Sequence, residues 1–222
     1  MSKNRVIIVA AGKGSRMGSD TPKQFLLLGG KPVLMHSIEA FHQFDPVISI
    51  ILVLPEDQLQ EWQNLQEIHQ FNIDHQVVTG GATRFQSVVN GLAVLPDEGI
   101  VAIHDGVRPL IKPSTIARLF AAAEKKDNAV PYTLPADSIR IEKKDTSVII
   151  DRNSIRMIQT PQVFHTLLIK AAYRQKEKSS FTDDASVFEK SGYKINLVEG
   201  QASNIKITGA EDLTVAEGLL KG

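Results

Sequence analysis

Short apolar segments of strand length alternate with longer segments of helical periodicity along this 222-residue chain, and this alternation limits the possible folds. The predicted strands are residues 5–9, 50–54, 74–78 and 100–104. The predicted helices are residues 33–42, 56–70 and 85–95, and one that Pro113 opens. Repeated strand–helix–strand units predict an α/β fold, a Rossmann-like and mostly parallel sheet with helices on both faces.

A different pattern begins at Thr133. Residues 138–142 and 147–151 are strand-like, and a polar turn separates them. This pattern predicts an antiparallel β-hairpin arm, about residues 133–154, that projects from the domain. Beyond it we expect helices at 164–176 and 183–190, a strand at 194–198, and a last helix. Thr208 and Glu211 have the spacing of a capping box for that last helix.

The composition limits what the chain can bind. Lys plus Arg and Asp plus Glu both number 25, so the formal net charge is zero. Such a chain has no overall field to attract nucleic acid or an anionic membrane, and we expect neither as a partner. The chain has no cysteine, which excludes disulfides, thiolate metal sites and cysteine nucleophiles and fits a reducing, cytoplasmic location. We expect neither a signal peptide nor a spanning helix at residues 6–11, and residues 1–222 to form a single domain.

The loop after the first predicted strand is rich in glycine and positive charge. Residues 10–18 read Ala-Ala-Gly-Lys-Gly-Ser-Arg-Met-Gly. Glycines let backbone N–H groups approach an anion closely. The spacing is neither that of the dinucleotide fingerprint nor that of a P-loop. Lys13, Arg16 and Lys23 suit a triphosphate that loses pyrophosphate, although a plain glycine-rich turn with solvated basic residues is the alternative.

Two further loops follow predicted strands. Asp105 lies at the carboxyl end of one, where it could hold Mg²⁺, and Arg108 could grip a phosphate with two hydrogen bonds. The alternative is an Asp-Gly turn with a surface arginine. Gly80 and Gly81 precede the helix that contains Ser87, and small residues there would let a base lie against the backbone. This segment could also be only a turn.

Other chemistries have little support. The six histidines show no ligand spacing of a zinc site, and no Gly-x-Ser-x-Gly elbow indicates a serine hydrolase. Residues 151–154, 159–162, 181–184 and 204–208 are unremarkable one by one. Together they supply Arg, Thr and Lys donors suited to a second phosphate.

Taken together, these motifs resemble those of one enzyme family from Val6 to Leu220. The motifs are, in chain order, Ala-Ala-Gly-x-Gly-x-Arg-Met, Pro-Lys-Gln, Gly-Gly-x-x-Arg-x-x-Ser-Val, His-Asp-x-x-Arg-Pro, Asp-Arg-Asn, Thr-Pro-Gln, Thr-Asp-Asp and Asn-Ile-Lys-Ile-Thr. The chain resembles the 2-C-methyl-D-erythritol 4-phosphate cytidylyltransferases of the non-mevalonate isoprenoid pathway. The resemblance implies a Mg²⁺-dependent enzyme, or one that uses another divalent cation. It would transfer CMP from CTP to 2-C-methyl-D-erythritol 4-phosphate, with release of pyrophosphate and formation of 4-diphosphocytidyl-2-C-methyl-D-erythritol.

The resemblance also implies a role for each matched residue. The implied catalytic residues are Arg16, Lys23 and Lys206. The implied nucleotide-binding residues are Ala10, Ala11, Gly12, Gly14, Gly81, Ala82, Ser87, Asp105 and Gly106, with Asp105 also as the metal ligand. The implied acceptor-binding residues are Arg108, Ser138, Arg152, Thr160 and Thr182.

In the family the hairpin is an arm that embraces a second subunit, so the resemblance implies a homodimer in which Ser138 and Arg152 complete the partner's site. Ser138 stands where threonine is expected, which keeps the hydroxyl. Ile155 and Arg156 stand where Leu-Trp is expected, so the local packing near Arg152 would differ.

Three alternatives stay open at this point. A ribitol 5-phosphate cytidylyltransferase would have the same loops and a different acceptor. A nucleotide-binding regulatory protein without catalysis would tolerate the loss of Arg16, Lys23, Asp105 and Lys206, all of which are present. A nicotinamide oxidoreductase is disfavoured by the spacing and the positive charge of the glycine loop.

Overall fold

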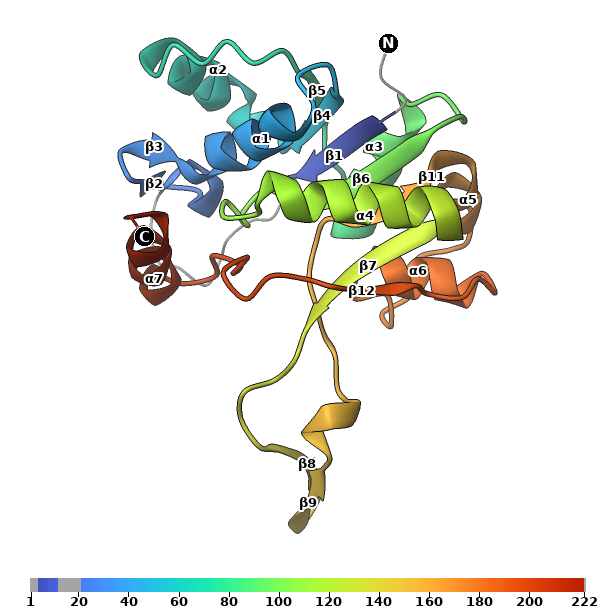
Figure 1. Ribbon diagram of the computed structural model, residues 1–222. Coiled ribbons are helices and arrows are strands. Elements are labelled where there is room, and N and C mark those ends of the chain that lie inside the picture. Colours follow the sequence, from blue (N-terminus) through green and yellow to red (C-terminus); the bar gives the residue numbers. More distant parts are fainter. Residues whose placement is uncertain (1–3, 12–20, 222) are drawn as a thin grey trace.

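The computed structural model describes residues 4–11 and 21–221 (Figure 1). The elements are, in chain order, β1 (Asn4–Val9), η1 (Lys23–Phe25), β2 (Leu27–Leu28), β3 (Lys31–Pro32), α1 (Val33–Phe44), β4 (Ser49–Leu54), η2 (Glu56–Gln58), α2 (Leu59–Ile68), β5 (Gln76–Thr79), α3 (Arg84–Ala93), β6 (Ile100–Asp105), α4 (Pro113–Lys126), β7 (Asn128–Thr133), β8 (Ile139–Lys143), β9 (Thr146–Ile150), η3 (Arg152–Ser154), β10 (Met157–Ile158), β11 (Gln162–His165), α5 (Thr166–Ala172), α6 (Asp184–Lys190), β12 (Leu197–Glu199) and α7 (Ala210–Lys221). The three η elements are short 3-10 helices.

Eight of the described strands form one large mixed sheet. Its order is β10-β7-β11-β6-β1-β4-β5, and β12 pairs with β7. The neighbours β6, β1, β4 and β5 are all parallel, whereas β11 runs antiparallel to both β6 and β7. The predicted mostly parallel sheet of an α/β fold is confirmed.

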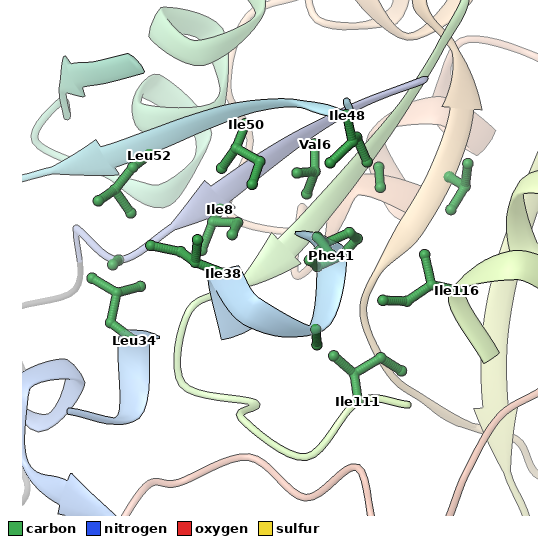
Figure 2. Close-up of a cluster of buried hydrophobic side chains, with 14 of the residues drawn as sticks. Val6, Ile8, Leu34, Ile38, Phe41, Ile48, Ile50, Leu52, Ile111 and Ile116 are labelled. Carbon is green, nitrogen blue, oxygen red and sulfur yellow. The ribbon is translucent and has the colours of Figure 1, made fainter. Parts of the chain in front are cut away.

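Helices cover both faces of this sheet, as predicted. Successive side chains of a strand point to opposite faces, and in β1 the side chains on both faces are apolar and need to be buried. Val6 and Ile8 of β1 pack in a cluster with side chains of α1, α2 and α4. Ile7 and Val9 pack on the other face with side chains of α3, α5 and α6. Figure 2 shows the first of these clusters, where side chains of α1 lie against those of β1 and β4.

The antiparallel strand β11 corrects one prediction. The helix predicted for residues 164–176 starts as a strand, and only α5, from Thr166 to Ala172, is helical. Val163 and Phe164 are both fully buried, one in each of the two clusters. A short apolar run buried on both sides does not reveal its period in the sequence. For the same reason no strand is predicted above for residues 128–133, which form β7.

The start of α7 corrects a second prediction. Asp212 Oδ2, and not Glu211, accepts hydrogen bonds from the backbone N–H groups of Thr208 and Gly209, at 2.8 and 2.9 Å. It also accepts one from the Thr208 hydroxyl at 2.6 Å. The predicted capping box is therefore wrong, because the Thr208 hydroxyl and the backbone N–H groups just before Ala210 bind Asp212 instead of Glu211. None of the helices in the described part of the chain is long and apolar enough to cross a membrane.

The predicted antiparallel strand pair is present as β8 and β9, in register from Ile139↔Ile150 to Lys143↔Thr146. It forms a two-stranded sheet of its own. In Figure 1 this hairpin extends away from the main sheet, between the end of β7 and η3. Ile149 is 71% exposed there, and Ile141 and Val148 are exposed as well.

Candidate active site

The loops that follow β1 and β6 leave the sheet at the same edge. Val9 and Asp105 are register partners at the ends of these two strands, and Gly106 donates its backbone N–H to Val9 O at 2.9 Å. In open α/β sheets, ligands bind at this carboxyl edge. A pocket lies there, lined by Val9, Ala10, Ala11, Lys23, Gln24, Arg84, Asp105, Val107 and Lys206.

Small residues let three loops come together at this pocket. A Cβ at Gly106 would lie 2.9 Å from Leu34 Cδ1 and 3.1 Å from Ala10 Cβ. A Cβ at Gly80, after β5, would lie 2.7 Å from Ala11 Cβ. These distances are shorter than ordinary contacts between carbon atoms, so a Cβ at either glycine would force its neighbours to shift.

Asp105 is a buried carboxylate among three cations. Its Oδ2 accepts from Lys206 Nζ at 2.8 Å and lies 3.8 Å from Arg108 Nε. Its Oδ1 lies 3.4 Å from Arg84 Nε. Burial alone would raise the pKa of Asp105, but the charges of Arg84 and Lys206 outweigh it and hold the pKa well below its usual range. Asp105 is therefore ionised.

The backbone next to Lys206 explains how this lysine reaches Asp105. Ile207 donates its N–H to Val107 O at 2.9 Å. The side chains of Ile207 and Val107 belong to one small cluster that also contains Ala216 of α7. Ile207 thus fixes the segment before α7 against the loop after β6. As a result, the neighbouring Lys206 lies at the pocket.

Gln24 and Phe25 fix the short segment that carries Lys23, another residue that lines the pocket. Gln24 is 1% exposed, and its Nε2 donates to Ala10 O at 3.0 Å and to Gln58 Oε1. Phe25 is buried and stacks on Trp62, with 6.2 Å between ring centroids. Gln24 is missing from the predicted site residues, although the Pro-Lys-Gln motif contains it.

His104 and Thr160 are buried, do not line the pocket, and hold the Asp105–Arg108 loop in place. His104 is fully buried, and burial lowers its pKa to about 4, so the ring is neutral. Nε2 lies 3.1 Å from Arg108 O, which can only accept, so Nδ1 is the acceptor for the Thr160 hydroxyl at 3.2 Å. The same hydroxyl oxygen accepts the backbone N–H of Asp105 at 3.0 Å. Thr160 is 5% exposed and does not line the pocket.

Arg84 is a pocket residue that is absent from the predicted site. Its Nη1 and Nη2 donate to the two oxygens of Asp184, each at 2.8 Å. Asp184 is fully buried and also accepts from the Tyr173 hydroxyl at 2.6 Å. The Gly-Gly-x-x-Arg motif contains Arg84, but its partner lies 100 residues away, and no local pattern reveals that pair.

Ser87 supports the predicted base-binding loop. It is fully buried, donates to Thr83 O at 2.8 Å, and accepts the backbone N–H of Gly81 at 3.1 Å. Ala82 is exposed and donates its N–H to Gln86 Oε1 at 3.0 Å. The hydroxyl of Ser87 thus shapes the loop in this structure.

The predicted acceptor residues do not all lie in one place. Arg108 lies beside Asp105, donates to Asn204 O at 2.8 Å, and has a buried Nε without a hydrogen-bond partner among residues 4–11 and 21–221. Thr182 is exposed just before α6. Ser138 and Arg152 line a separate pocket on the hairpin. One chain therefore does not bring those two residues to Asp105.

The donor set at Asp105 fits a metal ion that arrives with a nucleotide. Asp105 is the one acidic residue among the described residues lining the pocket, and no cluster of three His, Cys, Asp or Glu residues occurs in the described ranges. Mg²⁺ is commonly held by one or two carboxylates, with waters and substrate phosphates as the other ligands. Three predicted site residues, Gly12, Gly14 and Arg16, lie outside the described residues.

Known proteins resemble this chain over nearly its whole length. The family model for 2-C-methyl-D-erythritol 4-phosphate cytidylyltransferase matches residues 5–222. The enzymes of that name from Phocaeicola vulgatus and Bacteroides fragilis are 49% and 50% identical, covering 97% and 96% of this chain and 98% of each relative.

Solved structures agree with this match. The 4-diphosphocytidyl-2C-methyl-D-erythritol synthase of Anaerococcus prevotii has a TM-score of 0.83 at 30% identity, and the alignment covers 99% of this chain and 98% of that one. The 2-C-methyl-D-erythritol 4-phosphate cytidylyltransferase of Thermus thermophilus has a TM-score of 0.80 at 30% identity, with 98% of both chains covered. The chain therefore belongs to the 2-C-methyl-D-erythritol 4-phosphate cytidylyltransferase family.

Proposed function

We propose that the pocket at Asp105 transfers CMP from CTP to 2-C-methyl-D-erythritol 4-phosphate, which forms 4-diphosphocytidyl-2-C-methyl-D-erythritol and pyrophosphate. The observation that carries this proposal is the ionised carboxylate of Asp105 among Lys206, Arg84 and Arg108 at the carboxyl edge of the sheet. An excess of cations around one carboxylate suits a polyphosphate with its divalent ion. Membership in the family supplies the nucleotide and the acceptor.

The chemistry is a single displacement at phosphorus. A phosphate oxygen of the acceptor attacks the α-phosphorus of CTP, and the bond from this phosphorus to the oxygen that bridges to the β-phosphate breaks. Negative charge grows on the α-phosphate oxygens and on the departing pyrophosphate. Lys23, Lys206 and Arg16 donate to these oxygens as they gain charge. No covalent bond to the enzyme is needed.

Asp105 would hold Mg²⁺, or another divalent cation, on the nucleotide phosphates. Such an ion supplies charge neutralisation and alignment of the phosphates when bound. Lys206 is held against Asp105 at 2.8 Å and can move to the α-phosphate once the nucleotide is present. The hydrogen bond to Asp105 thus keeps a catalytic cation at the pocket.

Small residues are proposed to recognise CTP through their backbone groups. Ala10, Ala11, Gly12 and Gly14 would wrap the phosphates. For the base, the proposal rests on the compact turn of Gly81 and Ala82 that Ser87 supports. Gly106 would lie near the ribose, where its missing side chain leaves room.

The acceptor phosphate is proposed to lie near Arg108 and Thr182, with Ser138 and Arg152 supplied by a partner subunit in a homodimer. The exposed apolar side chains of the hairpin and the separation of its pocket from Asp105 support this arrangement. The Thr160 hydroxyl already binds the backbone N–H of Asp105 and the ring of His104. We therefore propose that Thr160 affects acceptor binding indirectly, by positioning the loop from Asp105 to Arg108.

Pyrophosphate release by the purified protein with Mg²⁺ tests the proposal. CTP, UTP, ATP and GTP are each offered with 2-C-methyl-D-erythritol 4-phosphate or with ribitol 5-phosphate. We expect release only with CTP and the erythritol phosphate. Preference for ribitol 5-phosphate would overturn the acceptor assignment alone, and silence from folded protein that binds CTP would favour a regulatory role. The cytoplasmic location stays a prediction.

A further inference from the structure

We propose that Arg84 is a positioning residue that holds the Oδ1 oxygen of Asp105, and that Asp184 and Tyr173 fix Arg84 for this task. The inference rests on the proposed function, because it assigns the two oxygens of Asp105 different tasks at the metal and nucleotide site. It starts from the two cations that contact this carboxylate. Lys206 contacts Oδ2 at 2.8 Å, whereas Arg84 lies 3.4 Å from Oδ1.

The two cations differ in how firmly they are held. Arg84 makes two parallel hydrogen bonds of 2.8 Å to Asp184, the fork-to-fork geometry that fixes the orientation of the guanidinium as well as adding energy. Asp184 is fully buried, and Tyr173 donates to it at 2.6 Å. The Tyr173 ring packs on Phe85, with 4.7 Å between centroids. Arg84 can leave Asp105 only by disrupting this buried cluster.

Lys206 is held far less firmly. Its side chain is 39% exposed and ends in a point charge on a flexible stem, so it can turn from Asp105 to a phosphate. Arg108 Nε, at 3.8 Å from Oδ2, is too distant for a hydrogen bond. Nucleotide binding therefore frees Oδ2 of Asp105 and leaves Oδ1 on Arg84.

This division gives Asp105 a defined orientation when it faces a cation on the phosphates. Hydrogen bonds to a ligating carboxylate typically account for about 10- to 100-fold in metal affinity or activity. A buried ion pair such as Arg84–Asp184 is weak evidence of a stabilising device, since well-packed apolar residues often serve stability as well. The two parallel hydrogen bonds between Arg84 and Asp184 are instead explained by a positioning task, because they direct the Nε–H of Arg84 toward Asp105 in the pocket.

The test compares Arg84→Lys, which keeps the charge without the fork, with Arg84→Gln, which removes both. Calorimetry gives the dissociation constants of each protein for metal-free CTP and for the Mn²⁺–CTP complex. The dissociation constant for metal-free CTP divided by that for Mn²⁺–CTP measures how much the metal ion strengthens binding. We expect this ratio to fall about 10- to 100-fold in both variants. We also expect a matching rise in the Mg²⁺ concentration needed for half-maximal turnover, with kcat restored at saturating Mg²⁺.

A role of Arg84 that consists only of repelling the metal ion predicts different results for the two variants. If Arg84 acted only as a cation near the metal, Arg84→Gln would strengthen Mn²⁺–CTP binding and Arg84→Lys would leave it unchanged. Either result overturns the proposal. So does an unchanged ratio accompanied by a lower Tm, which would mark a purely structural cluster. Lys170→Met is the matched control, because it removes an ion pair of α5 with Asp97 outside the pocket.

A milder variant keeps the test valid if the Arg84 variants do not fold. Tyr173→Phe removes one hydrogen bond to Asp184 and leaves every charge in place. We expect a smaller fall in the same ratio, and no change would contradict the proposal. The binding ratio needs no turnover, so it is informative even if the wild-type protein releases no pyrophosphate, the result that would defeat the proposed function instead.

Discussion

Lys206 Nζ lies 2.8 Å from Asp105 Oδ2, although the two residues are 101 positions apart in the chain. The contact joins the last residue of a central strand to the segment that precedes the last helix. It exists because Ile207 binds Val107 through its backbone N–H, at 2.9 Å, and shares an apolar cluster with it. The apolar neighbours thus set the position of the charged pair.

Lys23→Ala should lower kcat for pyrophosphate release by about 10²- to 10³-fold, roughly 3–4 kcal/mol, because one donor to the growing charge is lost. The KM for CTP should change much less. Steady-state kinetics at saturating Mg²⁺ measures both constants. Lys125→Ala, at an exposed position of α4, is the matched control and should behave like the wild type. A Lys23 variant within a few-fold of wild type would remove this lysine from the mechanism.

Gly106→Ala should destabilise the protein and weaken CTP binding together. The added Cβ would lie 2.9 Å from Leu34 Cδ1 and 3.1 Å from Ala10 Cβ, so the Leu34 side chain and the backbone at Ala10 would have to shift. Overpacking of this kind costs about 1–3 kcal/mol. Urea unfolding gives the stability, and calorimetry gives the CTP affinity.

Gly218→Ala is the matched comparison for that experiment. Gly218 lies in α7, and its added Cβ would meet nothing within 4 Å. Alanine favours a helix by up to about 1 kcal/mol over glycine, so this variant should be slightly more stable with unchanged CTP affinity. Equal destabilisation of both variants would show that the close packing at Gly106 is not the cause.

Stability should fall as the pH drops from about 6.5 to about 4 because of His104. Burial lowers its pKa from 6.5 to about 4. Between these values the unfolded chain binds a proton that the folded chain does not, so lower pH favours unfolding by about 1.4 kcal/mol per pH unit. The contribution of neutral His104 to the free energy of unfolding is fully present above pH 6.5 and is lost by pH 4. The paired carboxylate of Asp105 loses its contribution only below the ordinary value of 3.8.

Urea unfolding at several pH values between 7 and 4 measures this dependence. His104→Gln removes the titrating ring while offering an amide to Thr160 and Arg108 O. Its stability should decline less steeply over the same range than that of the wild type. Parallel declines in the two proteins would assign the pH dependence to other groups.

How far the sequence predicts this site depends on whether the signal is local. The strands and the glycine turns have short-range patterns, so Asp105 is correctly predicted at the carboxyl end of a central strand. Lys206 is assigned only through resemblance, because nothing near it indicates its partner. Arg84 and Asp184, 100 positions apart, form a buried pair that no periodicity encodes. The strand β11 is missed because residues buried on both sides show no alternation.

Mixing two inactive variants should restore part of the activity if the hairpin completes the partner's site. Lys23→Ala damages the pocket and leaves the hairpin intact, whereas Arg152→Ala damages the hairpin and leaves the pocket intact. A mixed dimer then contains one site with both residues, its Lys23 from one protomer and its Arg152 from the other. Each variant alone should be weak, and the mixture, after subunit exchange, should release pyrophosphate faster than the sum of its parts.

The contrary result is equally clear. If the hairpin packed on its own domain, each site would draw both residues from one chain, and no mixture could gain activity. Lys23→Ala mixed with Lys23→Ala,Arg152→Ala is the control, since no combination of these chains carries an intact Lys23. Ile149→Asp adds an independent check, because a charge on this 71% exposed side chain should split the dimer in sedimentation experiments. Activity retained by such monomers would contradict a shared site.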